Sequence, residues 1–419
     1  MNLQSGTYYW PSTLPVAPSY PALQDNVECD VAIIGGGSSA AQCAYYLADQ
    51  GLKTVVLEKG TVGGGSTSTN TAIIQYSGEK MFTSLTNTFG EEYIARHLKL
   101  LKEAIDDIEA ASRRVEMDCE FCRRDTLYSA SCPEDVASLR NEYEFIKRHG
   151  VQVDFWKKED IEAKYPFSRD AAIYSYHDGE LNPYKFTHAL FQYAAKQGVL
   201  VYEHSEMNGH HYDKEQQRMI ISTKKGYQVS ARYVIFAAGY DNMDIRKEKQ
   251  ASFVSTYTVT TQPVTDFSTW HNRTLLWETA RPYIYIRSTA DNRVIIGGLD
   301  DNTTYPDDRD RKLIHKSELL IEEFNRRFPD IQVESAYSCA AFYGGMVDGL
   351  PIIGKYDDVP SSYFLLAYGD NGTVYSQLLS KIIAQEIVDG HSPDLELYLQ
   401  DRPYLKRLRS QVYDKQNFS

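Results

Sequence analysis

The first strong hydrophobic pattern in the chain is a short apolar run, Val31 to Ile34, followed by three glycines. An apolar run bounded by glycine is typical of a strand buried in a parallel sheet. Small and apolar residues spaced through 40–47 then predict a helix that ends near Gly51. A second apolar run at 54–57 predicts another strand. The pattern therefore predicts a β-α-β unit near the N-terminus.

Longer helices and a second kind of sheet follow this unit. Apolar residues from Ile94 to Ile108 recur at alternating intervals of four and three, which predicts a helix with one buried face. Similar patterns predict helices over 136–146 and 183–198, and a final helix over 378–387. The stretch 252–298 alternates apolar and polar residues with a period of two, which is typical of an antiparallel sheet. Because both kinds of element recur along the chain, we expect two domains, each built from segments that are not adjacent in sequence.

Composition and charge restrict the class of protein. The 419 residues are 42% hydrophobic and 24% charged, which is ordinary for a globular protein and excludes a disordered or fibrous chain. The net charge of −13 argues against nucleic acid or an anionic membrane as a partner, because both attract basic surfaces. No apolar run approaches the roughly 18 residues of a membrane-spanning helix, and residues 1–21 lack the pattern of a secretory signal. We therefore expect a cytoplasmic protein without an integral membrane segment.

Six cysteines in a chain of this length do not indicate a disulfide framework. Cys119 and Cys122 have the spacing of a metal-binding pair, and Cys132 follows them. A zinc site needs a fourth ligand nearby, and none is obvious in the sequence. Reduced thiols are the interpretation we favour, and no metal is expected.

The glycines after the first strand carry a more specific signal. Gly35, Gly37 and Ala40 form a G-x-G-x-x-A pattern directly between the predicted strand and helix. The first glycine allows a tight turn, the second lets a pyrophosphate approach the backbone, and the small third residue lets helix and strand pack closely. The helix N-terminus then presents free N–H groups and the positive end of its dipole to the phosphates.

Glu58 completes the pattern of a dinucleotide site. It ends the second strand 21 residues after Gly37, where a carboxylate can accept a ribose hydroxyl. This carboxylate disfavours NADP, whose 2′-phosphate it would repel, and leaves FAD and NAD. A late strand ending in Ala238 and Gly239, and a glycine cluster at 368–373 before the last helix, favour the longer cofactor, FAD.

The glycine cluster has two interpretations. The helix that starts there would place N–H donors and a dipole at the pyrimidine edge of a flavin, which would stabilise its anionic reduced form. The alternative is an ordinary loop that caps a helix. The candidate cofactor residues of this cluster are Gly369, Asn371, Gly372 and Thr373.

Seven segments, in the order of a known family, cover most of the chain. They are DVAIIGGGSSA (30–40), VVLEKG (55–60), GGGSTSTNTAII (63–74), ARYVIFAAGY (231–240), YIYIRSTADNRVIIGG (283–298), DGLPIIG (348–354) and YGDNGT (368–373). With them the sequence resembles the D-amino-acid oxidase-like superfamily of FAD-dependent oxidoreductases, which includes glycine oxidase, monomeric sarcosine oxidase and gamma-glutamylputrescine oxidoreductase.

The resemblance implies an α/β fold with a Rossmann-like FAD-binding domain. It also implies a second, α+β substrate domain whose antiparallel sheet covers the flavin. The expected boundaries are 25–90, 150–245 and 336–395 for the FAD-binding domain, 91–149 and 246–335 for the substrate domain, 1–24 for an N-terminal arm and 396–419 for a C-terminal tail.

The resemblance also places individual residues at the cofactor. Glu58 and Lys59 fall at the adenosine ribose, and Ser66 and Thr67 near the pyrophosphate. Met207 would offer its backbone to the adenine. In chain order, the expected cofactor-binding residues are Gly35, Gly37, Ala40, Glu58, Lys59, Gly65, Ser66, Thr67, Met207, Ala238, Gly239, Gly369, Asn371, Gly372 and Thr373.

Three positions depart from the family pattern. Amino-acid oxidases of the family carry an arginine shortly before DGxPxIG that pairs with the substrate carboxylate, and Tyr343 stands there in this chain. Sarcosine oxidase attaches its flavin to a cysteine in this region, but Cys339 is displaced from that position by two residues, so we expect non-covalent FAD. The sarcosine oxidase lysine that assists oxygen aligns with Ile295, which leaves oxidase and dehydrogenase both open.

Three candidate catalytic residues alternate along one predicted strand. Tyr283, Tyr285 and Arg287 are two residues apart and therefore share one face of that strand, and Tyr343 is expected opposite them. If this face is turned to the flavin, Arg287 would bind a carboxylate and the tyrosines would line a pocket. The alternative is a surface arginine stacked on structural tyrosines. Trp277 and Tyr257 are further pocket candidates.

The expected function is an FAD-dependent oxidoreductase that oxidises the C–N bond of a small amine or amino acid by hydride transfer to flavin N5. Oxygen or another electron acceptor would take up the electrons. The flavin performs the redox chemistry, so the protein must orient the substrate and favour its neutral amine form. One alternative is an FAD-dependent 2-hydroxy-acid or polyol dehydrogenase of the same fold, and another is a non-catalytic FAD-binding component.

Overall fold

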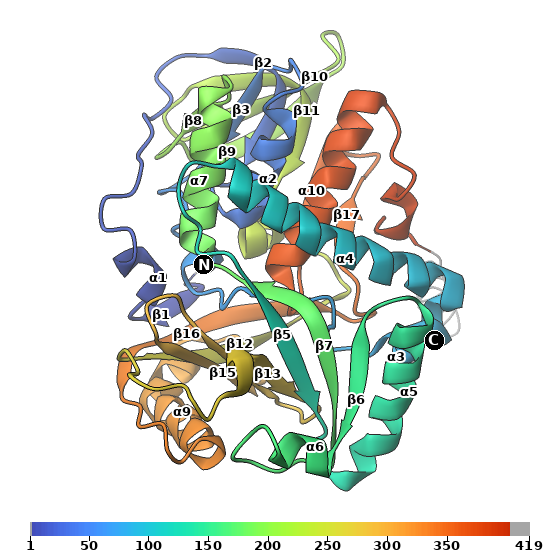
Figure 1. The fold of residues 1–419 in the computed structure, drawn as a ribbon. Coiled ribbons are helices and arrows are strands. Elements are labelled where there is room, and N and C mark those ends of the chain that lie inside the picture. The colour runs from blue at the N-terminus through green and yellow to red at the C-terminus, as the bar shows by residue number, and fades with distance from the viewer. Residues whose placement is uncertain (1, 403–419) are drawn as a thin grey trace, which may run out of the picture.

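The computed structural model describes residues 2–402. Within this range the strands form an eight-stranded and a ten-stranded sheet, which lie in the upper and lower halves of Figure 1. The mixed α/β class and the second, largely antiparallel sheet agree with the predicted fold class.

The smaller sheet contains the predicted β-α-β unit. Strands β2 (Val27–Ile34) and β3 (Thr54–Leu57) pair in parallel and are joined by α2 (Ser38–Leu47). The sheet order is β17-β18-β11-β2-β3-β8, and the pairs from β18 to β8 are parallel. Its remaining strands are β8 (Leu200–Tyr202), β9 (Met207–Asp213), β10 (Arg218–Thr223), β11 (Gln228–Phe236), β17 (Ile352–Gly354) and β18 (Ser362–Leu366).

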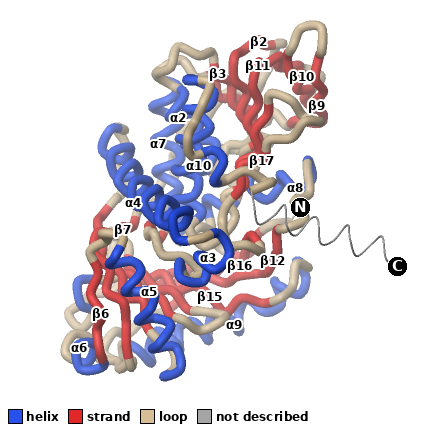
Figure 2. Tube along the Cα trace, turned by 90° about the vertical axis from the view of Figure 1, so that its right-hand side faces the viewer, coloured by secondary structure: helices blue, strands red, loops and turns tan. Residues whose placement is uncertain are grey.

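Four helices form a layer beside this sheet and extend toward the other one. Helix α2 packs against α7 (Pro183–Lys196) and α10 (Gly372–Asp389), and α10 packs against α4 (Glu91–Arg114). The N-terminus of α7 agrees with its prediction, since Pro183 starts the helix and the Asn182 side chain accepts a hydrogen bond from Lys185 N–H at 3.0 Å. Figures 1 and 2 both show α4 crossing between the two halves of the molecule.

The larger sheet has the order β1-β16-β12-β15-β14-β13-β5-β7-β4, with β6 attached to β7. Helix α9 (Pro306–Arg327) packs on it, and the apolar core of this half lies between them. Its strands are β1 (Gln4–Gly6), β4 (Ile73–Ile74), β5 (Cys122–Ser129), β6 (Val153–Lys157), β7 (Ala171–Glu180), β12 (Ala251–Thr261), β13 (Leu275–Glu278), β14 (Ile284–Ser288), β15 (Val294–Asp301) and β16 (Ser335–Met346). The other helices are α1 (Tyr9–Ser12), α3 (Phe82–Phe89), α5 (Val136–Arg148), α6 (Lys158–Glu162) and α8 (Asn242–Ile245).

Sheet membership differs from the expected domain boundaries in four places. Strand β4, inside the expected FAD-binding segment 25–90, pairs with β7 of the larger sheet. Strand β7, within the segment 150–245 that we expected in the FAD-binding domain, pairs instead with β5 of the larger sheet, and β6 pairs with β7. Strand β16 also belongs to the larger sheet, although nearly all of it falls in the segment 336–395 that was assigned to the other domain. The N-terminal arm is not merely laid over the surface, because β1 adds an edge strand to β16. Of the expected C-terminal tail, residues 403–419 lie outside the described residues.

Among residues 2–402, no helix combines the length and the apolar composition that a membrane crossing requires.

Candidate active site

The turn after β2 is built for a close approach of backbone to a ligand. Gly35 has φ +122°, and a Cβ there would lie 2.5 Å from the carbonyl oxygen of Ala237. A Cβ on Gly36 would lie 2.7 Å from Cγ of Glu58. Both positions therefore require glycine. Ala40 is fully buried and does not line a cavity, which fits its expected role in helix–strand packing.

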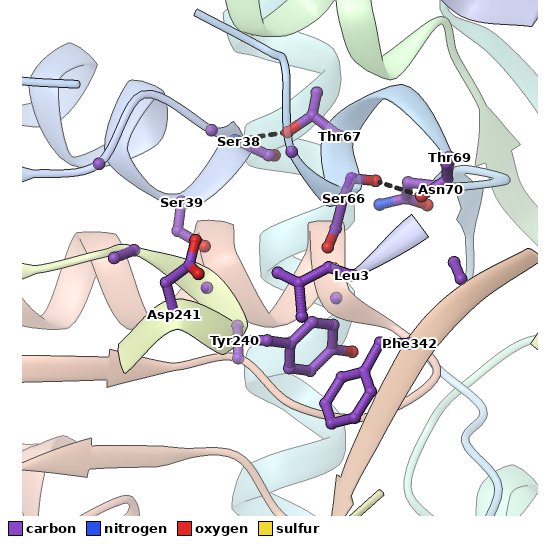
Figure 3. Close-up of a pocket in the computed structure, with 18 of the residues that line it drawn as sticks. Leu3, Ser38, Ser39, Ser66, Thr67, Thr69, Asn70, Tyr240, Asp241 and Phe342 are labelled. Carbon is purple, nitrogen blue, oxygen red and sulfur yellow. Dashed lines mark hydrogen bonds between the residues drawn. The ribbon is translucent and has the colours of Figure 1, made fainter. Parts of the chain in front are cut away.

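A glycine-rich loop closes over the N-terminus of α2. The Ser38 N–H donates to Thr67 Oγ1 at 3.0 Å, and the Ser39 hydroxyl lies 2.7 Å from that of Ser376 on α10. Figure 3 shows Ser38, Ser39, Ser66 and Thr67 grouped on one side of the cavity and Tyr240 and Phe342 on another. Hydroxyls and helix N–H groups thus converge where a pyrophosphate would need them.

Glu58 lies at the end of β3, beside this turn. Its Oε1 accepts a hydrogen bond from Gly60 N–H at 2.6 Å. Burial raises the pKa of the Glu58 carboxyl above its usual range, against the opposing effect of backbone N–H donors at 60 and 36. Lys59 next to it forms an ion pair with Asp241 at 2.7 Å.

These elements surround one cavity of about 730 Å³, which we call the cofactor cavity. Its lining includes all the expected cofactor-binding residues except Ala40 and Thr373, namely Gly35, Gly37, Glu58, Lys59, Gly65, Ser66, Thr67, Met207, Ala238, Gly239, Gly369, Asn371 and Gly372. The hydroxyl of Thr373 instead accepts a hydrogen bond from Asn70 Nδ2 at 2.9 Å. Segments far apart in sequence therefore meet around one space.

The N-terminus of α10 faces the same cavity. Gly369 has φ +130°, and α10 starts at Gly372 without a side-chain N-cap. The Asn371 side chain instead donates to Ser77 O at 2.8 Å. The helix therefore leaves N–H groups uncapped on the cavity side, as a flavin-facing helix end requires.

A second cavity, of about 680 Å³, adjoins the cofactor cavity, and we call it the side chamber. Residues that line both spaces mark the junction between them, and they are Tyr283, Asp300, Tyr343, Tyr368, Gly369 and Asp370. Two of the candidate catalytic residues, Tyr283 and Tyr343, thus lie at this junction. Tyr285 lines the cofactor cavity, where Gly297 leaves room for its ring.

Arg287 does not reach either cavity, so the structure does not support its expected role as a carboxylate anchor. Its Nη1 donates to the carbonyl oxygens of Thr71, Ala72 and Leu181 at 2.8–2.9 Å, and Nε lies 3.5 Å from Glu180. The alternation along β14 correctly puts Arg287 on the same face of the strand as Tyr285. Arg287 lies further along the strand, however, beneath the loop at 71–72. The guanidinium holds this loop in place and has no free donor pair for a substrate.

Burial controls the ionisation of the junction residues. It raises the pKa values of Tyr283 and Tyr343 well above the ordinary value, so both hydroxyls stay protonated at neutral pH. Burial and the neighbouring charge of Glu79 raise the pKa of Asp370 to about 7. Burial also raises the pKa of Asp300 to about 6.

Sequence reasoning missed several of the lining residues. Asp370 lies inside the glycine cluster that the sequence singled out, but only its neighbours were assigned. Asp300 and Gln75 carry no motif that would mark them. Trp277 lines the cofactor cavity, whereas the other further candidate, Tyr257, is buried elsewhere and donates to Asp301 at 3.0 Å.

The cysteines do not form a metal site within residues 2–402. All six are free thiols, and no group of three or more metal-binding side chains lies together in this part of the chain. Cys119 and Cys122 therefore lack the further ligands that zinc needs.

Comparison with known proteins agrees with this architecture. Residues 30–386 match the model of the DAO family, described as FAD dependent oxidoreductase. The chain belongs to this family. It is therefore an FAD-dependent oxidoreductase, and the cavity with its glycine turn, carboxylate and helix N-termini fits FAD.

This chain covers different shares of its relatives in the DAO family. It is 24% identical to the gamma-glutamylputrescine oxidoreductase of Escherichia coli (strain K12), over 92% of this chain and 89% of that protein. It is 25% identical to the YhfW protein of Bacillus subtilis (strain 168), whose name describes a Rieske 2Fe-2S iron-sulfur protein. That match covers 56% of this chain and only 45% of YhfW, so the chain spans less than half of that relative.

Solved structures share the fold of this family member. Glycine oxidase from Geobacillus kaustophilus superposes with a TM-score of 0.72 at 20% identity, over 88% of this chain and 96% of that one. The L-proline dehydrogenase from P. horikoshii gives a TM-score of 0.74 at 18% identity, over 93% and 99% of the two chains.

Proposed function

We propose that this FAD-dependent oxidoreductase oxidises the C–N bond of a small amine or amino acid. The observation that carries the proposal is the junction, where the cofactor cavity opens into a chamber large enough for an organic substrate. When bound, FAD supplies the hydride acceptor at N5 of its isoalloxazine. The named relatives, which include a gamma-glutamylputrescine oxidoreductase, support a substrate that contains an amine nitrogen.

The chain's own residues would hold the cofactor and orient the substrate. The N-terminus of α2 and the hydroxyls of Ser66 and Thr67 would bind the pyrophosphate, and Glu58 a ribose hydroxyl. The neutral hydroxyls of Tyr283 and Tyr343 would line the substrate site and offer it hydrogen bonds. The buried junction would exclude water from the reacting carbon and nitrogen.

Non-covalent binding of FAD is supported by the position of Cys339. This residue does not line the cofactor cavity, and burial raises the pKa of its thiol to about 12. A thiol that stays protonated is a poor nucleophile. The six free thiols are also the form expected in a reducing compartment, which supports a cytoplasmic location.

The experiment is anaerobic titration of the purified holoenzyme with amines, amino acids, 2-hydroxy acids and polyols, followed by the flavin absorbance. Bleaching by nitrogen-containing substrates supports the proposal, and bleaching by hydroxy acids or polyols alone would contradict it in favour of C–O oxidation. If no compound bleaches the flavin, the catalytic role fails and a binding component remains. Precipitation with acid should release the yellow colour if FAD is non-covalent, and oxygen uptake during turnover separates oxygen from another electron acceptor.

A further inference from the structure

Two buried carboxylate oxygens are unpaired where the side chamber meets the cofactor cavity, and one buried amide oxygen is unpaired in the cofactor cavity itself. Asp370 Oδ2 and Asp300 Oδ1 are buried and have no hydrogen-bond partner among residues 2–402. Gln75, only 5% exposed, lines the cofactor cavity and likewise leaves Oε1 unpaired within the described chain. Because unpaired buried acceptors cost free energy, the three oxygens indicate a ligand that brings N–H donors.

The charge at the junction is negative. Glu79 joins the two aspartates, and its Oε2 accepts from the Tyr343 hydroxyl at 3.5 Å. After burial, the charges of Asp370, Glu79 and Asp300 are the next largest causes of the raised pKa of Tyr283. All three carboxyls therefore act on the Tyr283 hydroxyl, and Asp370 and Asp300 line the same junction.

The protein's own cations do not neutralise the two junction aspartates. Arg281 lines the side chamber, where its Nε lies 3.8 Å from Oε1 of Glu79 and its Nη1 donates to backbone carbonyls at 278–280. Lys80 donates to the carbonyl of Val347. Asp301, in the same wall, is paired with two lysines of α9 at 3.0 and 3.1 Å. Within the described residues, Asp300 and Asp370 thus have no ion-pair partner, whereas Asp301 in the same chamber has two.

Aromatic rings form much of the remaining wall. They favour a cation as well, because the face of an aromatic ring attracts positive charge. At about 680 Å³ the chamber is in the size range of pockets for drug-sized ligands, which exceeds what a two- or three-carbon amino acid needs. The rings of the side chamber belong to Tyr76, Phe82, Tyr283, Tyr343, Tyr368 and Tyr375.

We propose that the junction binds the substrate as an organic cation, an alkylammonium with no carboxylate next to its nitrogen, and that Asp370 and Asp300 recognise the ammonium group. This inference rests on the proposed function and narrows its substrate class from amines and amino acids to amines. Because hydride transfer needs the neutral amine, the bound ammonium must first give one proton to a junction carboxylate. An α-carboxylate would have to enter beside the two junction aspartates, and like charges at short range repel. Tyr343, at the same junction, offers such a group a neutral hydroxyl only.

Pairs of ligands that differ only in the carboxylate test the substrate class. We choose butylamine with norvaline and pyrrolidine with proline, because each amino acid is its amine plus one carboxylate on the carbon beside nitrogen. Butan-1-ol serves as the uncharged analogue. Binding to the anaerobic holoenzyme is measured by isothermal titration calorimetry, and flavin absorbance is recorded on the same samples. Each amine should bind at least about tenfold more tightly than its partner amino acid and than the alcohol, since hydrogen bonds to charged groups are the stronger ones.

Variants at the junction test the residues. Asp370→Asn and Asp300→Asn should each weaken amine binding by about tenfold or more and leave amino-acid binding no weaker. Asp308→Asn is the charge-matched control, because it removes an exposed carboxyl on α9 that pairs with Arg311. It should leave amine binding unchanged. FAD content and thermal unfolding of every variant show whether it is folded.

The outcomes separate this inference from the function on which it rests. Tighter binding of norvaline and proline than of the amines, or unchanged amine affinity in both junction variants, would overturn the cation site even if the flavin is reduced. Tight amine binding that depends on Asp370 but never bleaches the flavin would support the cation site and count against C–N oxidation.

Discussion

At the residue scale, Gly35 and Gly65 both line the cofactor cavity but tolerate a side chain very differently. A Cβ at Gly35 meets a backbone carbonyl at 2.5 Å, and its φ of +122° is strained for any other residue. Gly65 has φ −89° and nothing within 4 Å of a Cβ. We predict that Gly35→Ala lowers the free energy of unfolding by roughly 1–3 kcal/mol and reduces bound FAD, and that Gly65→Ala changes neither. Denaturant unfolding and flavin absorbance measure both effects. Equal losses in the two variants would show that the strain argument is wrong.

The Asp370 carboxyl should lower the free energy of unfolding of the flavin-free protein at neutral and higher pH. Its folded pKa of about 7 is above the unfolded value near 4, mainly through burial and then through Glu79, with Arg281 acting weakly in the opposite direction. Stability from this group is fully present below pH 4 and is lost as pH rises through about 7. Asp370→Asn should therefore raise the melting temperature at pH 8, and the gain should shrink toward pH 5. A gain that is independent of pH would contradict the raised pKa.

Candidate site residues could be predicted from the sequence where a local motif determines their geometry. Gly35, Gly37 and Glu58 follow from one β-α-β unit, because the turn and the strand end are defined within 30 residues of chain. Arg287 was misplaced because alternation gives the face of a strand but not which distant loop covers that face. Asp300 was missed because its importance arises from a cavity that only the tertiary structure forms.

At the element scale, the N-terminal strand β1 acts on the cofactor cavity from outside the Rossmann-like unit. Asn2, Leu3 and Gln4 line the cavity, and β1 is held by pairing with β16. Gln4 Nε2 donates to Gly64 O at 3.2 Å and to Ser68 Oγ at 3.1 Å, which ties the arm to the glycine-rich loop.

Removing this tie should speed the loss of FAD. We predict that Gln4→Ala increases the dissociation rate of FAD by about three- to tenfold, since each neutral hydrogen bond contributes about 0.5–1.5 kcal/mol. The rate is measured by diluting the holoenzyme and following the fluorescence of the released flavin over time. Val16→Ala, at an exposed position of the same arm, is the control and should leave the rate unchanged. A rate equal to that of the unmodified protein would show that the arm does not retain the cofactor.

Elements whose partners are near in sequence were predicted, and those with distant partners were not assigned to the correct sheet. The helices α5 and α7 follow from periodicity and caps, which are local signals. Strands β6 and β7 were expected with the nucleotide-binding sheet because they follow it in chain order. The pairing of β7 with β5, and of β6 with β7, depends on register between separate segments, which a single sequence does not encode in any local pattern.

At the scale of the whole molecule, the cofactor cavity joins the two sheets. Its lining comes from the ends of β2 and β3 in the smaller sheet and from β15 and β16 in the larger one. FAD bound there would contact both halves, so it should stabilise the arrangement of the two sheets as well as each sheet alone. This coupling predicts a change in the form of the unfolding transition and not only in its midpoint.

Removal of FAD should therefore lower the melting temperature and broaden or split the transition. A ligand at about a thousand times its Kd adds about 4 kcal/mol to the stability of the folded state, which corresponds to several degrees for a chain of this size. Differential scanning calorimetry of the holoenzyme, the deflavinated protein and the deflavinated protein with FAD restored measures the effect. Restored FAD should return a single sharp transition. If holoenzyme and deflavinated protein melt with the same shape and midpoint, FAD does not couple the two sheets.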